Sequence, residues 1–234
     1  CIAGTVVFSL GAARLLGRGW RLAVLTGGAV SICGASAAVA IAAILPQNAQ
    51  SDRNLSFTVF SVTLLSTVAM VAYPIIGTAL GMSDATMALF LGATIHDVAQ
   101  VVGAGFSVSD QVGETATTVK LIRVAMLAPF VMLLALALSV FGAAPRDGAE
   151  RPPLLPWFVV LFAALAAAAS FGLIPPGLRE LMWQTSRWLL LTAIVGVGLR
   201  TDLGGLLAMP RTALILIVAQ TGLLAAAVAA WLMI

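Results

Sequence analysis

Charged side chains are scarce in this sequence. Lys, Arg, Asp and Glu make up 9% of its 234 residues, whereas a soluble domain carries about 25%. Hydrophobic residues make up 61%, and the mean hydropathy is +1.10. Several apolar runs of roughly 20 residues are long enough to cross the ~30 Å hydrocarbon core of a bilayer. These figures exclude an ordinary soluble domain and predict an all-α, polytopic membrane protein, because only helices satisfy an isolated backbone in lipid.

Histidine and cysteine are almost absent as well. The single histidine, His96, cannot form a two-histidine zinc site. The two cysteines, Cys1 and Cys33, cannot make a disulfide framework. There is no HExxH, GxSxG or P-loop motif, so we expect no enzyme, cofactor or metal. The net charge of +3 forms no basic stripe interleaved with aromatics, so nucleic acid is not an expected partner.

Eight apolar segments follow one another, joined by short polar connections. They run approximately over residues 1–13, 22–45, 55–81, 85–106, 117–143, 157–174, 188–209 and 212–234. The chain starts inside such a segment and has no charged n-region, so it does not begin with a signal peptide. We therefore expect an N-terminally truncated fragment.

If every segment crosses the membrane, the connections alternate between two sides. One side receives Arg14, Arg18, Arg21, Arg146, Arg151 and Arg211; the other receives Arg53, Arg179, Arg187 and the acidic residues Asp110 and Glu114. Because Lys and Arg accumulate in cytoplasmic loops, the first group is predicted to be cytoplasmic.

Two segments are interrupted by small and polar residues. The second contains SICGASAA (31–38), and the seventh contains VGVGLRTDLGG (195–205). An odd number of crossings separates them, which is typical of inverted repeats with broken helices at matching positions. We therefore predict two crossing broken helices, with residues 1–81 as the last three helices of a first repeat and 85–234 as a complete five-helix repeat. The alternative is that the small residues only allow close helix packing.

Ionisable residues inside the apolar segments are candidates for a binding site, because a buried charge in lipid is costly. His96, Asp97 and Gln100 lie in the middle of the fourth segment, where they are candidates for proton coupling or substrate contact. The alternative is a hydrogen-bonded network that only joins helices. Lys120 and Arg123, three residues apart on one helix face, are candidates for attracting an anion; alternatively they reach toward the headgroups.

The interrupted segments add further candidates for the same anion site. A helix that begins near Gly34 would direct free N–H groups at the membrane centre, and Ser31 and Ser36 would add hydroxyl donors. Arg200 is a further candidate, with its charge partly balanced by Asp202.

Five stretches, in this order and spacing, resemble the YeiH-type family of bacterial inner-membrane proteins, which are usually labelled sulfate exporters. They are SICGASAAVA (31–40), YP (73–74), GATIHDVAQVVGAG (92–105), KLIRVAMLAP (120–129) and PWFVVLF (156–162). The resemblance implies the fold of the sodium/proton antiporter and bile-acid symporter superfamily, with two inverted five-helix repeats. It also implies a longer N-terminus, and the family usually has His-Glu where this chain has His96-Asp97.

We therefore expect a secondary transporter of the bacterial inner membrane that exports a small anion by alternating access, with sulfate or a related sulfur-containing anion as the substrate that the resemblance implies. Protons or sodium are the expected coupling ions, and the oligomeric state, a homodimer included, is open. One alternative is a cation/proton antiporter in which Asp97 or Asp202 binds the ion. Another is a non-transporting receptor or structural subunit.

Overall fold

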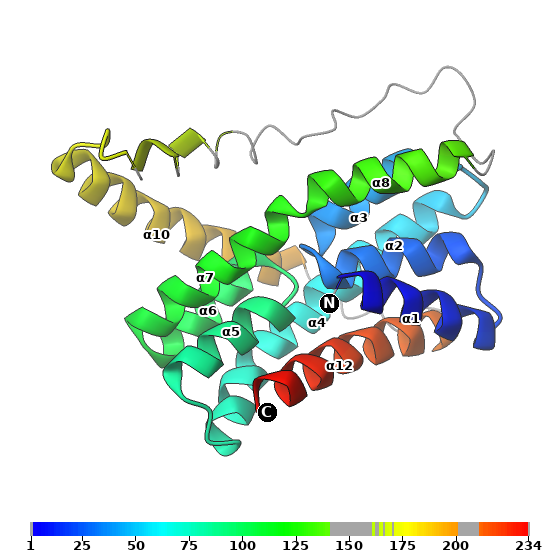
Figure 1. The fold of residues 1–234 in the computed structure, drawn as a ribbon, viewed down its shortest axis with the longest axis horizontal. Coiled ribbons are helices and arrows are strands. Elements are labelled where there is room, and N and C mark those ends of the chain that lie inside the picture. The colour runs from blue at the N-terminus through cyan, green and yellow to red at the C-terminus, as the bar shows by residue number, and fades with distance from the viewer. Residues whose placement is uncertain are drawn as a thin grey trace. The chain divides into compact units, whose positions relative to one another are not determined.

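The computed structural model describes residues 2–140, 161, 164–165, 167–169, 171–200 and 211–233, and the secondary structure of these residues is helical. They fall into two compact units, Cys1–Pro152 with Thr201–Ile234, and Pro153–Arg200. The second unit contains α10 (Pro176–Arg200). The first contains α1 (Ile2–Leu15), α2 (Trp20–Ser31), α3 (Ala35–Ile44), α4 (Ser51–Ala79), α5 (Asp84–Thr94), α6 (Val98–Val108), α7 (Asp110–Ala125), α8 (Leu127–Val140) and α12 (Arg211–Leu232) (Figure 1).

Three parts of the first unit are long and apolar enough to cross a membrane. They are α4, α7 with α8 (Asp110–Val140), and α12. Each corresponds to a span that the sequence predicts, so the prediction of a helical membrane protein is confirmed. The predicted span at 157–174 lies partly outside the described residues.

The second predicted span is not one continuous helix; it folds back on itself as a helical hairpin. The chain leaves α2 after Ser31 and enters α3 at Ala35, so the predicted interruption at 31–38 is confirmed. Gly28 on α2 faces Ile41 on α3 so closely that a Cβ at Gly28 would overlap the Ile41 side chain. Residues from the start of α2 and the end of α3 also line one pocket. Both ends of the α2–α3 hairpin therefore lie at the same end of the bundle, and the two arms run side by side (Figure 1).

A second hairpin replaces the predicted continuous span at 85–106. The helix breaks between Thr94 and Val98, giving α5 and α6 as separate arms. The hydroxyl of Ser109, just after α6, donates to Asp84 Oδ2 at the start of α5 over 3.4 Å. The two outer ends of the α5–α6 hairpin are therefore neighbours. The prediction of one unbroken helix here is wrong: α5 ends at Thr94, and Asp97 caps a new helix.

The two hairpins enter the bundle from opposite ends. Helix α4 connects them: it starts beside the outer end of the α2–α3 hairpin, where Asn54 shares a pocket with Arg21, and leads after Ala79 to α5. Each arm has 10 to 12 residues, a length of about 15–18 Å at 1.5 Å per residue. This is about half of the hydrocarbon core, so the two tips meet near its middle.

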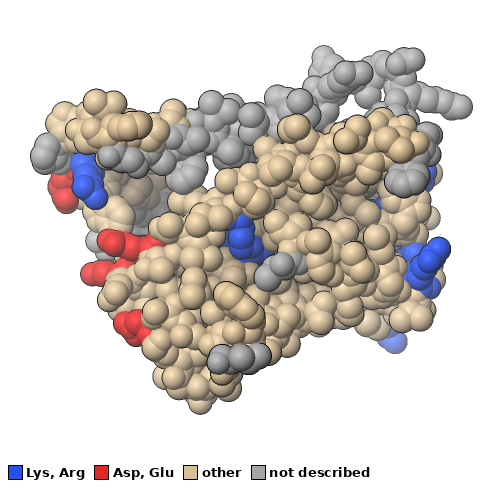
Figure 2. Space-filling model, viewed as in Figure 1, with Lys and Arg blue, Asp and Glu red and all other residues tan. Residues whose placement is uncertain are grey.

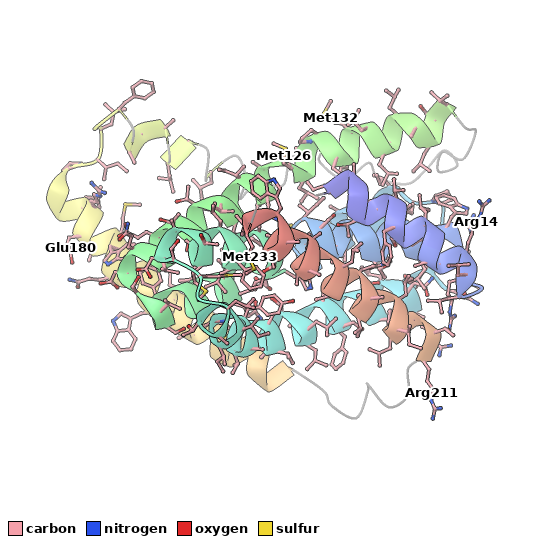
Figure 3. All side chains as sticks on the ribbon, turned by 60° about the horizontal axis from the view of Figure 1, so that its bottom comes forward. Arg14, Met126, Met132, Glu180, Arg211 and Met233 are labelled. Carbon is pink, nitrogen blue, oxygen red and sulfur yellow. The ribbon has the colours of Figure 1, made fainter. Side chains whose placement is uncertain are left out.

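This topology changes the predicted distribution of charge. Since the α2–α3 hairpin returns to its starting side, Arg53 lies at the same end as Arg14 and Arg21, and the prediction that it lies opposite them is wrong. Arg14 and Arg211 lie at this end in Figure 3, and Asp52 shares it. Acidic side chains gather at the other end of this unit (Figure 2), where α5 and α7 begin with Asp84 and Asp110. The basic end is accordingly the predicted cytoplasmic end.

Cysteine labelling distinguishes a hairpin from a crossing span. Three exposed positions mark the two ends of the bundle: Leu15 at the end of α1, Ala49 in the connection from α3 to α4, and Ala85 at the start of α5. We expect Leu15→Cys and Ala49→Cys to react with an impermeant maleimide from the same side of membrane vesicles, and Ala85→Cys to react from the other. If the second apolar segment (22–45) crossed the membrane as one helix, Ala49→Cys would be labelled from the side opposite to Leu15→Cys.

Candidate functional site

The tips of the two hairpins meet on Lys120 of α7. Its side chain is completely buried, with 0% exposure. The ammonium donates to the carbonyl of Ile32 at 2.8 Å and to that of Ile95 at 2.9 Å. These carbonyls lie at the ends of α2 and α5, where helical carbonyls lack intrahelical partners. Lys120 therefore holds the end of one hairpin arm to the end of the other.

Arg123 acts on the same two helix ends from one turn further along α7. Its Nε and Nη2 donate to Ser31 O at 3.2 and 2.8 Å, and Nη2 also reaches Val30 O at 3.2 Å. Its Nη1 donates to Gly92 O at 3.1 Å on α5. The negative ends of two helix dipoles thus face two basic side chains. As predicted, Lys120 and Arg123 point at one place, but the backbone carbonyls that they bind there were not predicted.

Gly92 allows this approach of α5 to α7. A Cβ at Gly92 would lie 2.5 Å from the Ala116 carbonyl oxygen and 2.8 Å from Val119 Cβ. Both neighbours belong to α7, and one of them is backbone, so the contact cannot relax easily. Because Gly92 has no side chain, α5 comes close enough to α7 for the Gly92 carbonyl, two residues before the end of α5, to accept from Arg123.

His96 lies in the turn between α5 and α6 and connects three parts of the site. It is fully buried, with Nδ1 3.1 Å from Val30 O and Nε2 3.0 Å from the hydroxyl of Thr221 on α12. A carbonyl oxygen only accepts, so the network assigns the Nδ1 hydrogen to this contact. Neutral Nε2 then accepts from the Thr221 hydroxyl in place of the bond that this hydroxyl otherwise donates to Ile217 O at 2.9 Å, whereas protonated Nε2 donates to the Thr221 oxygen and leaves that bond in place. The position is therefore hydrogen-bonded in either protonation state.

Asp97 begins α6 and faces α4. Its Oδ1 accepts from the Ala99 amide at 3.3 Å as an N-cap, and its own amide donates to the Ser66 hydroxyl at 3.0 Å. One turn later, Gln100 Nε2 donates to the Thr67 hydroxyl at 3.4 Å, while the buried Gln100 Oε1 has no hydrogen-bond partner among the residues that the structure describes. The carboxylate therefore balances the positive N-terminus of α6.

The N-terminus of α3 differs from that of α6. It begins after Gly34, and no side chain of the described residues caps it. Gly34 has φ +64° and ψ −122°, and a Cβ there would lie 3.6 Å from both Cβ and the carbonyl oxygen of His96. Ser36 is exposed in the first turn, while the buried Ser31 hydroxyl donates to Gly28 O at 3.3 Å within α2. Of the two predicted hydroxyl donors, only Ser36 is therefore on a surface.

The described structure covers only part of the interruption predicted in the seventh segment. Residues 195–200 continue α10 as a helix, which ends at Arg200 in the second unit. Asp202 and the rest of the predicted interruption, 201–205, lie outside the described residues. Of the two predicted interruptions, the structure shows the one at 31–38, and the division into inverted repeats stays a prediction.

The contributions of Ser66, Thr67 and Thr221 were missed by sequence reasoning. Each is a hydroxyl residue in a long apolar helix, and such residues usually bond to their own helix, as Thr67 also does with Thr63 O at 2.9 Å. Nothing in their spacing separates them from other hydroxyls of α4 and α12. Only their position opposite His96 and Asp97 identifies them.

The described residues thus define a multi-pass helical membrane protein with two opposed hairpins and a buried polar centre. The family model described as conserved hypothetical protein 698 matches residues 1–217, and the chain belongs to this family. The UPF0324 membrane protein TauZ of Paracoccus pantotrophus is 57% identical over 228 residues, which cover 97% of the chain and 68% of TauZ. A UPF0324 membrane protein of Rhizobium meliloti, RB0971, is 56% identical over 223 residues, 94% of the chain and 64% of that protein.

The resemblance to the YeiH-type family is also confirmed. The UPF0324 inner membrane protein YeiH of Escherichia coli K12 is 34% identical over 184 residues, which cover 78% of the chain and 52% of YeiH. The chain thus spans about two thirds of the length of TauZ and about half of YeiH. No solved structure matches the chain. Together with its spanning helices, these relatives identify the chain as a multi-pass protein of the bacterial inner membrane.

Proposed function

We propose that this chain is the major part of a secondary transporter, not an enzyme, that exports a small anion by alternating access. The observation that carries the proposal is the meeting of two opposed hairpin tips on Lys120. Non-helical backbone at this depth is tolerated in membrane proteins where it is buried in protein or lines a cavity, as in the broken helices of transporters. A site between two half-length hairpins is reachable from either side of the membrane when one hairpin moves.

The charges around the tips favour an anion as the substrate. Two basic side chains, Lys120 and Arg123, and one carboxylate, Asp97, surround the tips in the described structure. The α3 N-terminus has no capping side chain there, so its positive dipole end favours an anion near Gly34 and Ser36. Sulfate or another sulfur-containing anion is the first candidate. Its transport is coupled in this proposal to protons through His96 and Asp97, or to sodium.

A cation/proton antiporter is the second candidate. The unpartnered Gln100 Oε1, one turn after Asp97, favours it, because two oxygen acceptors on one helix face suit a small hard cation. In that function, the basic residues would serve only to neutralise the helix ends.

Ligand-dependent stabilisation tests these functions. The full-length protein, purified in detergent, is heated with sulfate, sulfite, thiosulfate, organic sulfonates or chloride, with and without sodium, and across pH. We expect one anion class to raise the Tm in a saturable manner. A response to sodium alone would support the antiporter, and no response to any of these ions would support a receptor or structural subunit.

Asp97→Asn separates the roles of the carboxylate charge and of the helix cap. Asparagine also caps helices well, so we expect a loss of stability well below the ~1 kcal/mol typical of replacing a cap by alanine. The substitution removes the carboxylate charge, so it should abolish the pH dependence of anion binding and leave the affinity at low pH unchanged. Asp84→Asn, at an exposed position at the start of α5, is the matched control. Loss of sodium binding at every pH would instead assign Asp97 to a cation site.

A further inference from the structure

A pocket lies at the outer end of the α2–α3 hairpin, opposite to the tip. It is a shallow, half-open pocket: the space between its lining atoms is about 290 Å³ with open solvent included, and about 20 Å³ of it is left for the centres of water-sized molecules. Leu25, Ala42 and Leu45 line it from the hairpin arms, and polar residues of the following connection and the first turns of α4 complete it. Its wall is therefore apolar on the hairpin side and polar on the side of the connection.

Arg21 is the basic residue of this pocket. Its Nε is buried and has no hydrogen-bond partner in the described structure. The neighbouring amides are used by the chain itself: Gln47 Nε2 donates to Ala42 O at 2.9 Å, and Asn48 Oδ1 accepts from the Gln50 amide at 2.9 Å. An unpaired buried guanidinium N–H is costly, so the pocket contains an unmet charged donor that an external acceptor would satisfy.

The level of the pocket in the membrane indicates where that acceptor comes from. Trp20, next to Arg21, is 42% exposed, and the Arg21 guanidinium carbon lies 5.5 Å from the centre of its ring. Exposed tryptophans of membrane proteins lie at the level of the lipid headgroups. The pocket also belongs to the arginine-rich end of the first unit, which the positive-inside rule places in the cytoplasm. Basic pockets between helices on this side suit phospholipid headgroups.

We propose that Arg21 binds the phosphate of an anionic phospholipid of the cytoplasmic leaflet, with the start of its acyl chains on Ala42. The guanidinium supplies the forked donors that a phosphate accepts. A lipid bound there contacts both arms of the α2–α3 hairpin and the first turns of α4, so it fixes the base of the hairpin whose tip reaches the polar centre. The inference is independent of the proposed transport function.

The test uses the full chain, delipidated in a neutral detergent. Phosphatidylglycerol, phosphatidylcholine or inorganic phosphate is added, and lipid retention by native mass spectrometry and Tm are measured. We expect phosphatidylglycerol to be retained and to raise the Tm more than phosphatidylcholine, and inorganic phosphate at the same concentration to have no effect. Equal protection by inorganic phosphate would overturn the assignment to a lipid.

Arg21→Gln should weaken phosphatidylglycerol binding at least about tenfold, the effect of losing one charged hydrogen bond. Arg14→Gln removes the same charge from an exposed position at the same end and should leave binding unchanged. Arg21→Lys keeps the positive charge but loses the two parallel donors of the guanidinium. It should also weaken binding about tenfold. Wild-type affinity in Arg21→Lys or Arg21→Gln, or an equal loss in Arg14→Gln, would overturn the proposal.

Discussion

Lys120→Met should lower the free energy of unfolding by about 3–5 kcal/mol in the absence of any ligand. Methionine fills a similar volume but leaves Ile32 O without its donor, and leaves Ile95 O with only the 3.3 Å bond from Arg123 Nη1. Each hydrogen bond to a charged group contributes about 1.5–3 kcal/mol, and these carbonyls lie at helix ends, where no amide of their own helix replaces the ammonium. For a chain of this size the Tm should fall by roughly 10 °C, measured by thermal unfolding in detergent.

The expected loss distinguishes a role in joining the hairpins from a role in attracting an anion. If Lys120 only attracted an anion, the substitution would leave the stability of the ligand-free protein unchanged and would weaken anion-dependent stabilisation alone. Ile122→Met is the matched control, because Ile122 lies on the same helix with 60% exposure and should change the Tm by very little. A ligand-free Lys120→Met protein as stable as the control would contradict the role that the structure assigns to Lys120.

Gly34→Ala should disable the site while leaving the bundle folded. Gly34 has φ +64° and ψ −122°, a conformation that residues with a side chain rarely adopt. Space is not the obstacle, because the nearest atom of His96 would be 3.6 Å from the new Cβ. The backbone at the tip must therefore change, at a cost of about 1–3 kcal/mol, and the Ile32 carbonyl would move away from Lys120. We expect loss of ligand-dependent stabilisation and of transport in vesicles.

Gly81→Ala controls for the loss of stability that any such substitution causes. Gly81 also has a positive φ, +68°, but it lies between α4 and α5 with nothing within 4 Å of a new Cβ. We expect a modest fall in Tm and normal ligand binding. If Gly81→Ala and Gly34→Ala lost ligand binding equally, the geometry of the α2–α3 tip would have no specific role in function.

Several features of the site were predictable from the residues alone. Ionisable side chains inside apolar segments have to be partnered in the protein interior, and this argument identifies His96, Asp97, Lys120 and Arg123. As expected, they gather around one centre, where His96 and Lys120 are buried and Asp97 and Arg123 are partly buried. The interruption at 31–38 was also predictable, because glycine and serine replace the aliphatic residues that continue a helix in lipid. Likewise, composition and apolar run length were enough to determine a multi-pass helical membrane protein.

Only the tertiary structure decided whether an apolar run crosses the membrane or returns. A run of 24 residues such as 22–45 has the same length and composition in both cases. What separates them is a contact between the two halves of the run: Gly28 lies against Ile41 in one hairpin, and Ser109 bonds to Asp84 in the other. The partners of Lys120 and Arg123 were undetermined for the same reason. Every residue has a carbonyl, and only the fold leaves those at the ends of α2 and α5 without an amide and within reach of α7.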